Sequence, residues 1–273
     1  MLTDTARRAR LLIIGGAAGT GLLRRFVDLA GGPAATVVVI ATASTTPDVL
    51  EAEHVRAFRD LGAGAVRALR LATRPDANDP AVTAVLESAT GVYFTGGDQS
   101  RIAAVLGGTR TDSLLQSLVA TGRVVLGGTS AGAAMMSSTM IVGGDGPGVT
   151  TDSVRTGPGL EFLPGVLIDM HFAERGRLNR LLSAVAHYPH ELGVGIDEDT
   201  AILAEGDAFE VLGSGSVTVV DAGGATDIRV PESGAIALSG ACIHVLPAGC
   251  RFELSGRRPS ILDAPAGERG RAA

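Results

Sequence analysis

A serine lies between two glycines at Gly128-Thr129-Ser130-Ala131-Gly132, and this pentapeptide has the clearest chemical potential in the sequence. An apolar run, Val124-Val125-Leu126, precedes it, and a helix-prone run from Ala131 to Ser138 follows. A serine on a sharp turn between a strand and a helix has its hydroxyl lifted above the sheet edge, where it can act as a nucleophile. The amide of Ala131 would then face a developing oxyanion. The same residues are also compatible with a buried turn of small side chains.

A serine nucleophile needs a base within hydrogen-bonding reach, and His171 is the histidine best placed to serve. It follows Val166-Leu167-Ile168-Asp169, a predicted strand, and precedes an arginine-rich segment. We therefore expect it at a strand carboxyl end, on the same edge as Ser130. The remaining histidines fall in a surface-type helix, at a helix end and in a late β segment, and they are His54, His187, His190 and His244.

A third group must orient the imidazole and stabilise its cation. Asp197, Glu198 and Asp199 follow one another at the end of another apolar run. Any one of them beside His171 would complete the chain order serine, histidine, acid, which differs from that of the α/β-hydrolases. Three consecutive carboxylates are equally typical of a solvated turn, so the residues themselves leave both interpretations open.

Three arginines follow the candidate base, at positions 175, 177 and 180. On a helix, Arg177 and Arg180 share one face. A guanidinium can hold a carboxylate with two parallel hydrogen bonds, so this group indicates a binding site for an acidic substrate. The alternative is internal pairing of these arginines with Asp169, with Glu174 or with the C-terminus of the helix.

The loop Gly96-Gly97-Asp98-Gln99 follows another predicted strand. Its backbone amides could supply a second oxyanion donor, and its glutamine could contact substrate. A tight turn between a strand and a helix would have the same composition.

Apolar, β-branched runs alternate with helical patterns along the first two thirds of the chain. This alternation predicts a mostly parallel central sheet with helices on both faces, in which sites form beyond the strand carboxyl ends. Thr46-Pro47 resembles a helix start, and Gly62 a helix end. The strands are expected at 11–14, 36–41, 65–69, 91–95 and 123–126.

Shorter alternating segments separated by glycine turns begin after about Ala201 and predict an antiparallel β extension. From residue 257 onward Arg, Pro, Gly and Ala dominate. We expect one α/β catalytic domain over 1–256, including the extension from about 201, and a flexible tail over 257–273.

Composition narrows the classes of function. The chain has 273 residues, 45% of them hydrophobic, which is enough for one large domain. Aromatic residues make up 3%, tryptophan is absent and the formal charge is −6, so nucleic-acid binding is not expected. All 23 basic residues are arginine. Without lysine, Schiff-base chemistry and a P-loop lysine are excluded.

The two cysteines, Cys242 and Cys250, do not make a disulfide framework and suit a reducing compartment. The apolar stretch Leu11 to Ile14 is too short for a signal sequence or a membrane span. We therefore expect a cytoplasmic protein with no membrane partner.

Taken together, the motifs resemble the cyanophycinase family, a group of serine peptidases that also contains aspartyl dipeptidases. The resemblance runs from about Leu11 to Leu254, in the same order and spacing. It rests on four segments, which are Gly127–Ala133, Gly96–Gln99, Asp169–Phe172 with the following Arg-x-Arg-x-x-Arg, and Gly195–Ala201. No single segment is specific, but the combination is.

The resemblance implies that Ser130 is the nucleophile, His171 the base and Glu198 the orienting acid. It implies an oxyanion hole built from amides of Gly97 or Asp98 and of Ala131. The implied substrate is cyanophycin, a poly-aspartate with arginine on each β-carboxyl, and the product is the β-Asp-Arg dipeptide. No cofactor or metal is implied, the scaffold is expected to be like that of class I glutamine amidotransferases, and a homodimer is expected. The implied substrate-binding residues are Gln99, Asp169, Arg175, Arg177 and Arg180.

Two departures from the family pattern bear on the substrate. Acidic residues usually follow the first Gly-Gly pair, whereas Gly15-Gly16 here continues into Ala17-Ala18-Gly19, and Met170 occupies a position where glutamine is common. An aspartyl or β-aspartyl dipeptidase therefore remains an alternative. A non-catalytic module for nucleotide or peptide binding is another, although the loop lacks the full G-x-G-x-x-G spacing. A glutamine-amidotransferase-like hydrolase is disfavoured because its elbow should carry cysteine.

Overall fold

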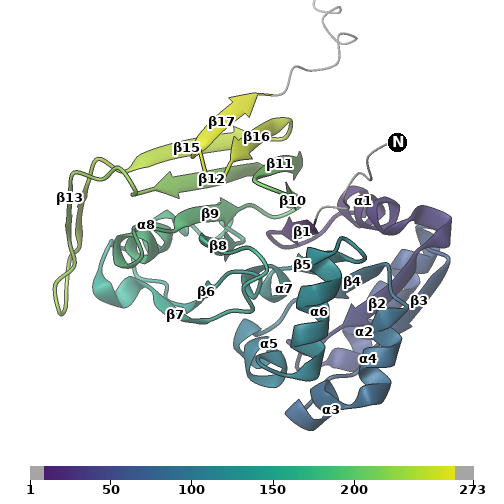
Figure 1. Ribbon diagram of the computed structural model, residues 1–273. Coiled ribbons are helices and arrows are strands. Elements are labelled where there is room, and N and C mark those ends of the chain that lie inside the picture. Colours follow the sequence, from purple (N-terminus) through teal and green to yellow (C-terminus); the bar gives the residue numbers. More distant parts are fainter. Residues whose placement is uncertain (1–8, 262–273) are drawn as a thin grey trace, which may run out of the picture.

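The computed structural model describes residues 9–261 and confirms a mixed α/β fold. Within this range, a nine-stranded sheet runs in the order β17-β16-β11-β10-β1-β5-β4-β2-β3, with helices packed beside the strands that come first in the sequence (Figure 1). A second sheet has the order β15-β12-β9-β8. The helices are α1 Thr20–Ala30, α2 Pro47–Asp60, α3 Arg74–Asn78, α4 Pro80–Glu87, α5 Gln99–Leu106, α6 Arg110–Ala120, α7 Ala131–Ala134 and α8 Leu178–His187. The strands are β1 Arg10–Ile14, β2 Thr36–Ile40, β3 Ala65–Ala68, β4 Gly91–Phe94, β5 Val125–Thr129, β6 Thr139–Gly143, β7 Arg155–Pro158, β8 Val166–Met170, β9 Leu192–Ile196, β10 Thr200–Glu205, β11 Ala208–Gly213, β12 Ser216–Asp221, β13 Asp227–Arg229, β14 Ala237–Ser239, β15 Cys242–Pro247, β16 Cys250–Glu253 and β17 Arg258–Ile261.

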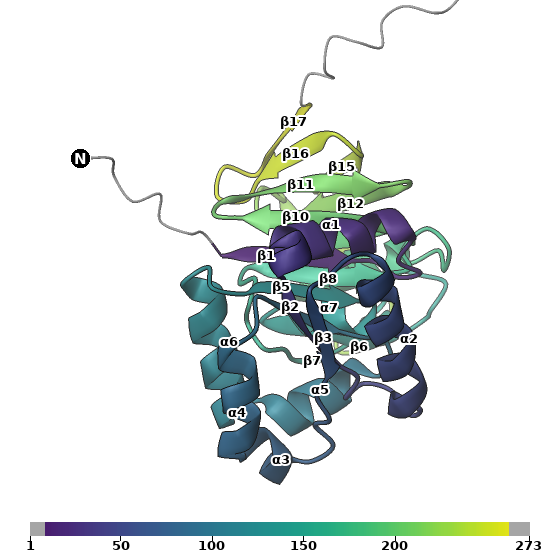
Figure 2. The ribbon, with the colours of Figure 1, turned by 90° about the vertical axis from the view of Figure 1, so that its right-hand side faces the viewer.

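Side chains alternate between the two faces of the parallel strands, which gives the sheet two cores. In β1, Leu12 and Ile14 pack with α1 and α2, whereas Leu11 and Ile13 face the core shared with α4 to α6. Figure 2 shows α2 on one side of the sheet and α4 and α6 on the other. The predicted strands at 11–14, 36–41, 65–69 and 91–95 are confirmed to within one residue, and Pro47 begins α2 as predicted.

The central sheet is only half parallel, which corrects the expectation of a mostly parallel one. Within residues 9–261, β1, β5, β4, β2 and β3 make four parallel pairs, and the strands beyond β1 make four antiparallel pairs. The reason is that β10 pairs with the free edge of β1, from Arg10 opposite Glu205 to Ile14 opposite Ala201. The late antiparallel strands thus extend the same sheet that carries the early parallel ones.

Strand β8, which leads to His171, lies in the second sheet rather than in the sheet of Ser130. It pairs in parallel with β9, and β9 pairs with β12. Apolar side chains of this sheet, Ile168, Val194 and Val219 among them, join the core that also contains α7. The expectation that Ser130 and His171 share one sheet edge is therefore wrong. The carboxyl ends of β5 and β8 nevertheless lie close together, although they belong to different sheets.

The chain stays ordered beyond the expected domain boundary at residue 256. Arg258–Ile261 forms β17, which pairs with β16 through a tight turn at Gly256 and Arg257. Arg257 has a φ of 50° and is paired with Asp221, while Cys250 and Phe252 of β16 are buried in the core, so both contacts secure this hairpin. The remainder of the expected tail, 262–273, lies outside the described residues. No helix within residues 9–261 is long and apolar enough to cross a membrane.

Candidate active site

Ser130 lies on a strained turn between β5 and α7. Its φ is 52° and its ψ is −109°, a conformation that side chains with a Cβ rarely adopt. The flanking glycines permit the turn, because a Cβ on Gly128 would lie 2.2 Å from the carbonyl oxygen of Gly132. Helix α7 ends at Ala134 instead of continuing to Ser138, since the carbonyls of Met135 and Met136 accept hydrogen bonds from Leu160 and Leu163.

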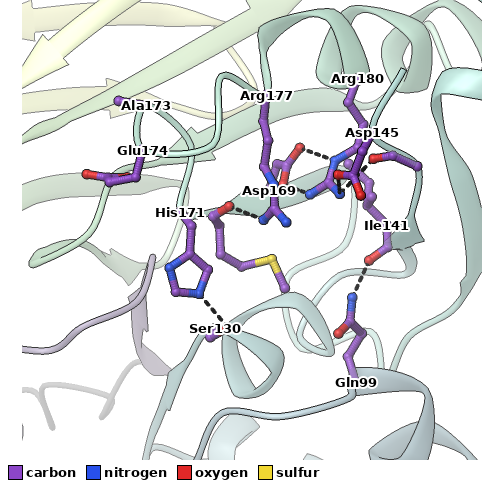
Figure 3. A network of polar contacts seen from close by, with 12 residues as sticks. Gln99, Ser130, Ile141, Asp145, Asp169, His171, Ala173, Glu174, Arg177 and Arg180 are labelled. Atoms are coloured by element: carbon purple, nitrogen blue, oxygen red, sulfur yellow. Dashed lines mark hydrogen bonds and ion pairs between the residues drawn. The ribbon is translucent and has the colours of Figure 1, made fainter. Parts of the chain in front are cut away.

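The structure brings Ser130, His171 and Glu198 into one hydrogen-bonded chain. Ser130 Oγ lies 2.9 Å from His171 Nε2, a contact drawn in Figure 3, and His171 Nδ1 lies 2.6 Å from Glu198 Oε1. A carboxylate only accepts hydrogen bonds, so Nδ1 carries the ring proton and Nε2 accepts from the serine hydroxyl. This is the tautomer in which an imidazole can remove a proton from serine.

The Gly15-Gly16 pair at the end of β1 holds His171 in place. The amide of His171 donates to the carbonyl of Gly15 over 2.8 Å. A Cβ on Gly16 would lie 2.2 Å from His171 Cε1, so the ring rests directly on this glycine. The sequence drew attention to the pair without giving it a role. The usable signal was its position at the carboxyl end of β1, the strand beside the one that carries Ser130.

The three consecutive acids make three different sets of contacts. Asp197 accepts hydrogen bonds from the amide of Ala173 and from Ser216, while Asp199 accepts from the amide of Gly19 and from Ser214. Glu198, between them, is left to face His171. Its neighbours thus tie the turn to both sheets and to the start of α1.

Backbone strain concentrates at this place. Six non-glycine residues within the described part of the chain have positive φ, and four of them are Ala17, Ser130, His171 and Asp199. Such conformations cost roughly 1–3 kcal/mol each and persist where surrounding structure holds them. All four belong to the turns that meet at the Ser130–His171 contact.

Two backbone amides remain for an oxyanion. The amides of Gly97 and Ala131 have no hydrogen-bond acceptor among the described residues. The amide of Asp98 already donates to the carbonyl of Ala43 over 2.9 Å, and its carboxylate accepts from the amide of Ser100. Asp98 is therefore the N-cap of α5, and the expectation that it supplies an oxyanion donor is wrong.

A cleft of about 310 Å³ opens beside Ser130 and His171. Gln99 lines it, with its side-chain amide donating to the carbonyl of Ile141 over 2.6 Å, as Figure 3 shows. Four arginines and one carboxylate among the described residues also line it, and they are Arg155, Arg175, Arg177, Arg180 and Asp145. The cleft is therefore cationic although the whole chain is acidic.

Asp169 does not reach this cleft, which corrects the expectation that it contacts substrate. Its side chain is fully buried and accepts hydrogen bonds from Nε and Nη2 of Arg180, with Arg177 Nη1 3.5 Å away (Figure 3). Arg180 also donates to the carbonyl of Gly144. Burial raises the pKa of the Asp169 carboxyl, and the charge of Arg180 opposes that rise. The alternative of internal pairing is thus correct for Arg180 and partly correct for Arg177, which is the N-cap of α8.

We expect Asp169→Asn to lower the free energy of unfolding by about 3–5 kcal/mol, because it leaves the buried Arg180 guanidinium without its counter-charge. Chemical denaturation measures this change. Asp145→Asn is the matched control, since Asp145 contacts the same guanidinium at 3.6 Å but is 85% exposed, and its loss should cost less than about 1 kcal/mol. Equal effects of the two variants would contradict a structural role for Asp169.

Residues 9–261 contain no group of three or more His, Cys, Asp or Glu side chains arranged to hold a metal ion. Sequence reasoning missed Arg155 as a residue of the cleft and Gly16 as the residue against the His171 ring. Arg155 lies on the short strand β7, for which no pattern was detected.

Residues 9–212 match the model of the family described as peptidase family S51. The chain is 40% identical over 267 residues to a protein of Trichormus variabilis named cyanophycinase, covering 94% of this chain and 89% of that protein. A cyanophycinase of Geminocystis herdmanii is 36% identical over 261 residues, covering 92% and 96%.

Solved structures show the same fold at lower sequence identity. A peptidase from an acI-B1 actinobacterium superposes with a TM-score of 0.68 at 21% identity, covering 91% of this chain and 98% of that one. A putative peptidase E from Listeria monocytogenes gives a TM-score of 0.55 at 18% identity, covering 76% and 99%.

Proposed function

The chain belongs to peptidase family S51, and we propose that it is a serine exopeptidase that hydrolyses cyanophycin to β-Asp-Arg dipeptides. The observation that carries the proposal is the hydrogen-bonded chain from Ser130 through His171 to Glu198, next to a cationic cleft. The relatives named cyanophycinase, 36–41% identical over most of the chain, support the choice of substrate.

In the proposed first step, Ser130 Oγ attacks a backbone carbonyl carbon of the poly-aspartate chain while its proton passes to His171 Nε2. Glu198 stabilises the imidazolium that forms. The imidazolium then gives its proton to the leaving amine as the C–N bond breaks, which leaves an acyl-enzyme. Water, deprotonated by His171, attacks the ester and releases the second product.

The amides of Gly97 and Ala131 are the proposed donors to the tetrahedral oxyanion. Loss of one such donor in a serine peptidase costs about 2.7–4 kcal/mol of transition-state stabilisation. Gln99, Arg175 and Arg177 are the proposed substrate contacts, while Arg180 positions Asp169 and the loop at Gly144.

A dipeptidase would need few cations, whereas cyanophycin presents a free α-carboxylate on every arginyl branch. The surplus of guanidiniums in the cleft therefore favours the polymer over a short aspartyl peptide. A homodimer, a cytoplasmic location and a scaffold like that of the class I glutamine amidotransferases are also part of this proposal. The homodimer and the scaffold follow from the resemblance, and the location from the two free cysteines.

Mass spectrometry of the products from purified cyanophycin tests the proposal. We expect the dipeptide of aspartate and β-linked arginine as the accumulating product, released from chain ends without a ladder of internal fragments. A parallel incubation with Asp-X dipeptides distinguishes the alternative. If the dipeptides are hydrolysed and cyanophycin is not, the proposed substrate would be overturned.

A further inference from the structure

Arg155, on strand β7, lines the cleft, and its guanidinium has no hydrogen-bond or ionic partner among the described residues. Two other cleft arginines already donate to internal acceptors. Arg180 is bound to Asp169 and to the carbonyl of Gly144, and Arg177 donates to the carbonyl of Met170. Arg155 is exposed, so its guanidinium is available to a ligand.

Local structure directs this guanidinium over Gly143. Strands β6 and β7 pair antiparallel, with Gly143 opposite Arg155 at an irregularity between Ile141 and Gly143. A Cβ on Gly143 would lie 2.6 Å from Arg155 Nη2 and 3.2 Å from Nε. The missing side chain of Gly143 therefore provides the space that the guanidinium occupies at the cleft wall.

The charge of the cleft favours an anionic ligand for this group. When Asp145 and the buried Asp169 are set against the four arginines, two positive charges remain uncompensated. Arg155 and Arg175 are the two whose guanidiniums have no hydrogen-bond or ionic partner within residues 9–261. A guanidinium binds a carboxylate with two parallel N–H···O bonds, which combine charge with fixed geometry.

We infer that Arg155 is a specificity-determining residue that binds a carboxylate of the substrate. The inference rests on the proposed function, because it takes cyanophycin as the substrate. That polymer offers two kinds of carboxylate near a cleavable bond, the α-carboxylate of an arginyl branch and the carboxylate at the end of the aspartate chain. Arg155 acts on binding alone and takes no part in proton transfer.

The test compares three synthetic aspartate oligomers with wild type and Arg155→Met. One oligomer carries arginine on every branch, the second carries argininamide and the third has a C-terminal amide. We expect Arg155→Met to raise KM for the unmodified oligomer by roughly 10- to 100-fold with kcat within about twofold, as for loss of one charged hydrogen bond. The amide that removes the bound carboxylate should raise KM for wild type and leave KM unchanged for the variant.

Gly143→Ala moves the guanidinium without removing its charge. The backbone at Gly143 is compatible with alanine, and the three nearest heavy atoms all belong to the flexible Arg155 side chain, so the fold should survive. We expect KM to rise in Gly143→Ala, and we expect no further rise when Gly143→Ala is added to Arg155→Met. Arg24→Met, an exposed arginine on α1 away from the cleft, should keep the wild-type KM for all three oligomers.

Wild-type turnover of the unmodified oligomer is measured first. Its absence would overturn the proposed function, and the assignment of Arg155 with it. Normal wild-type turnover, with an unchanged KM in Arg155→Met, would overturn the assignment of Arg155 alone. A variant that still distinguishes both amidated oligomers as wild type does would have the same consequence.

Discussion

Ser130→Ala is expected to reduce hydrolysis of cyanophycin by roughly 10⁶-fold in kcat, the loss seen when a serine peptidase loses its nucleophile. The hydroxyl that lies 2.9 Å from His171 Nε2 is removed, and no acyl-enzyme can form. Product release followed by mass spectrometry measures the loss. A fluorophosphonate should label the wild-type protein on Ser130 and leave the variant unlabelled.

The matched control is Ser100→Ala, an exposed serine on α5, which should keep wild-type activity. Ser130→Gly separates strain from chemistry. Glycine relieves the positive φ of 52°, so this variant should be inactive and yet more stable than Ser130→Ala by about 1 kcal/mol or more. Full activity in Ser130→Ala would remove Ser130 from the proposed mechanism.

Gly16→Ala is expected to lower kcat/KM by about 10²-fold or more. The new methyl group would lie 2.2–2.9 Å from three atoms of the His171 ring, which must move away from Ser130. A misplacement of about 1 Å in a catalytic group is enough for a loss of that size. Steady-state kinetics measures the effect. Thermal unfolding accounts for the backbone cost, which is about 1–3 kcal/mol because φ is 144° at this position.

Gly21→Ala serves as the control, because Gly21 lies five residues after Gly16, in the first turn of α1. A Cβ at Gly21 meets nothing within 4 Å and its φ is not in the left-handed region, so activity and stability should stay near wild type. Wild-type kcat/KM in Gly16→Ala would show that His171 does not depend on this glycine for its position.

Local patterns were sufficient for four of the five strands in the parallel half of the fold, whereas β5, expected at 123–126, lies at Val125–Thr129. Strands β1, β2 and β4 consist mainly of buried apolar residues and end at turn residues, so their pattern can be recognised without knowledge of what packs on them. The turn at Ser130 was also predictable, because glycine spacing and the change from strand to helix are properties of neighbouring residues. Three consecutive acids could each have contacted His171. The resemblance to a known family, based on four short segments in fixed order, indicated that Glu198 is the one that does.

Pairing between distant segments could not be inferred in this way. Which sheet β8 joins, and that β10 extends the edge of β1, depend on long-range contacts that leave no local signal. The contacts of a charged side chain depend on its neighbours in space. Asp169 was therefore expected to line the cleft, whereas it is buried and hydrogen-bonded to Arg180. Only the tertiary structure shows that Gly16 supports the imidazole and that Gly143 makes room for Arg155, because the missing side chain of a glycine has meaning only where another group fills its space. The residue types and turns that the chemistry needs can be recognised along the chain. Which of them meet depends on folding, because hydrogen bonds and packing act over a few ångströms of space whatever the separation along the chain.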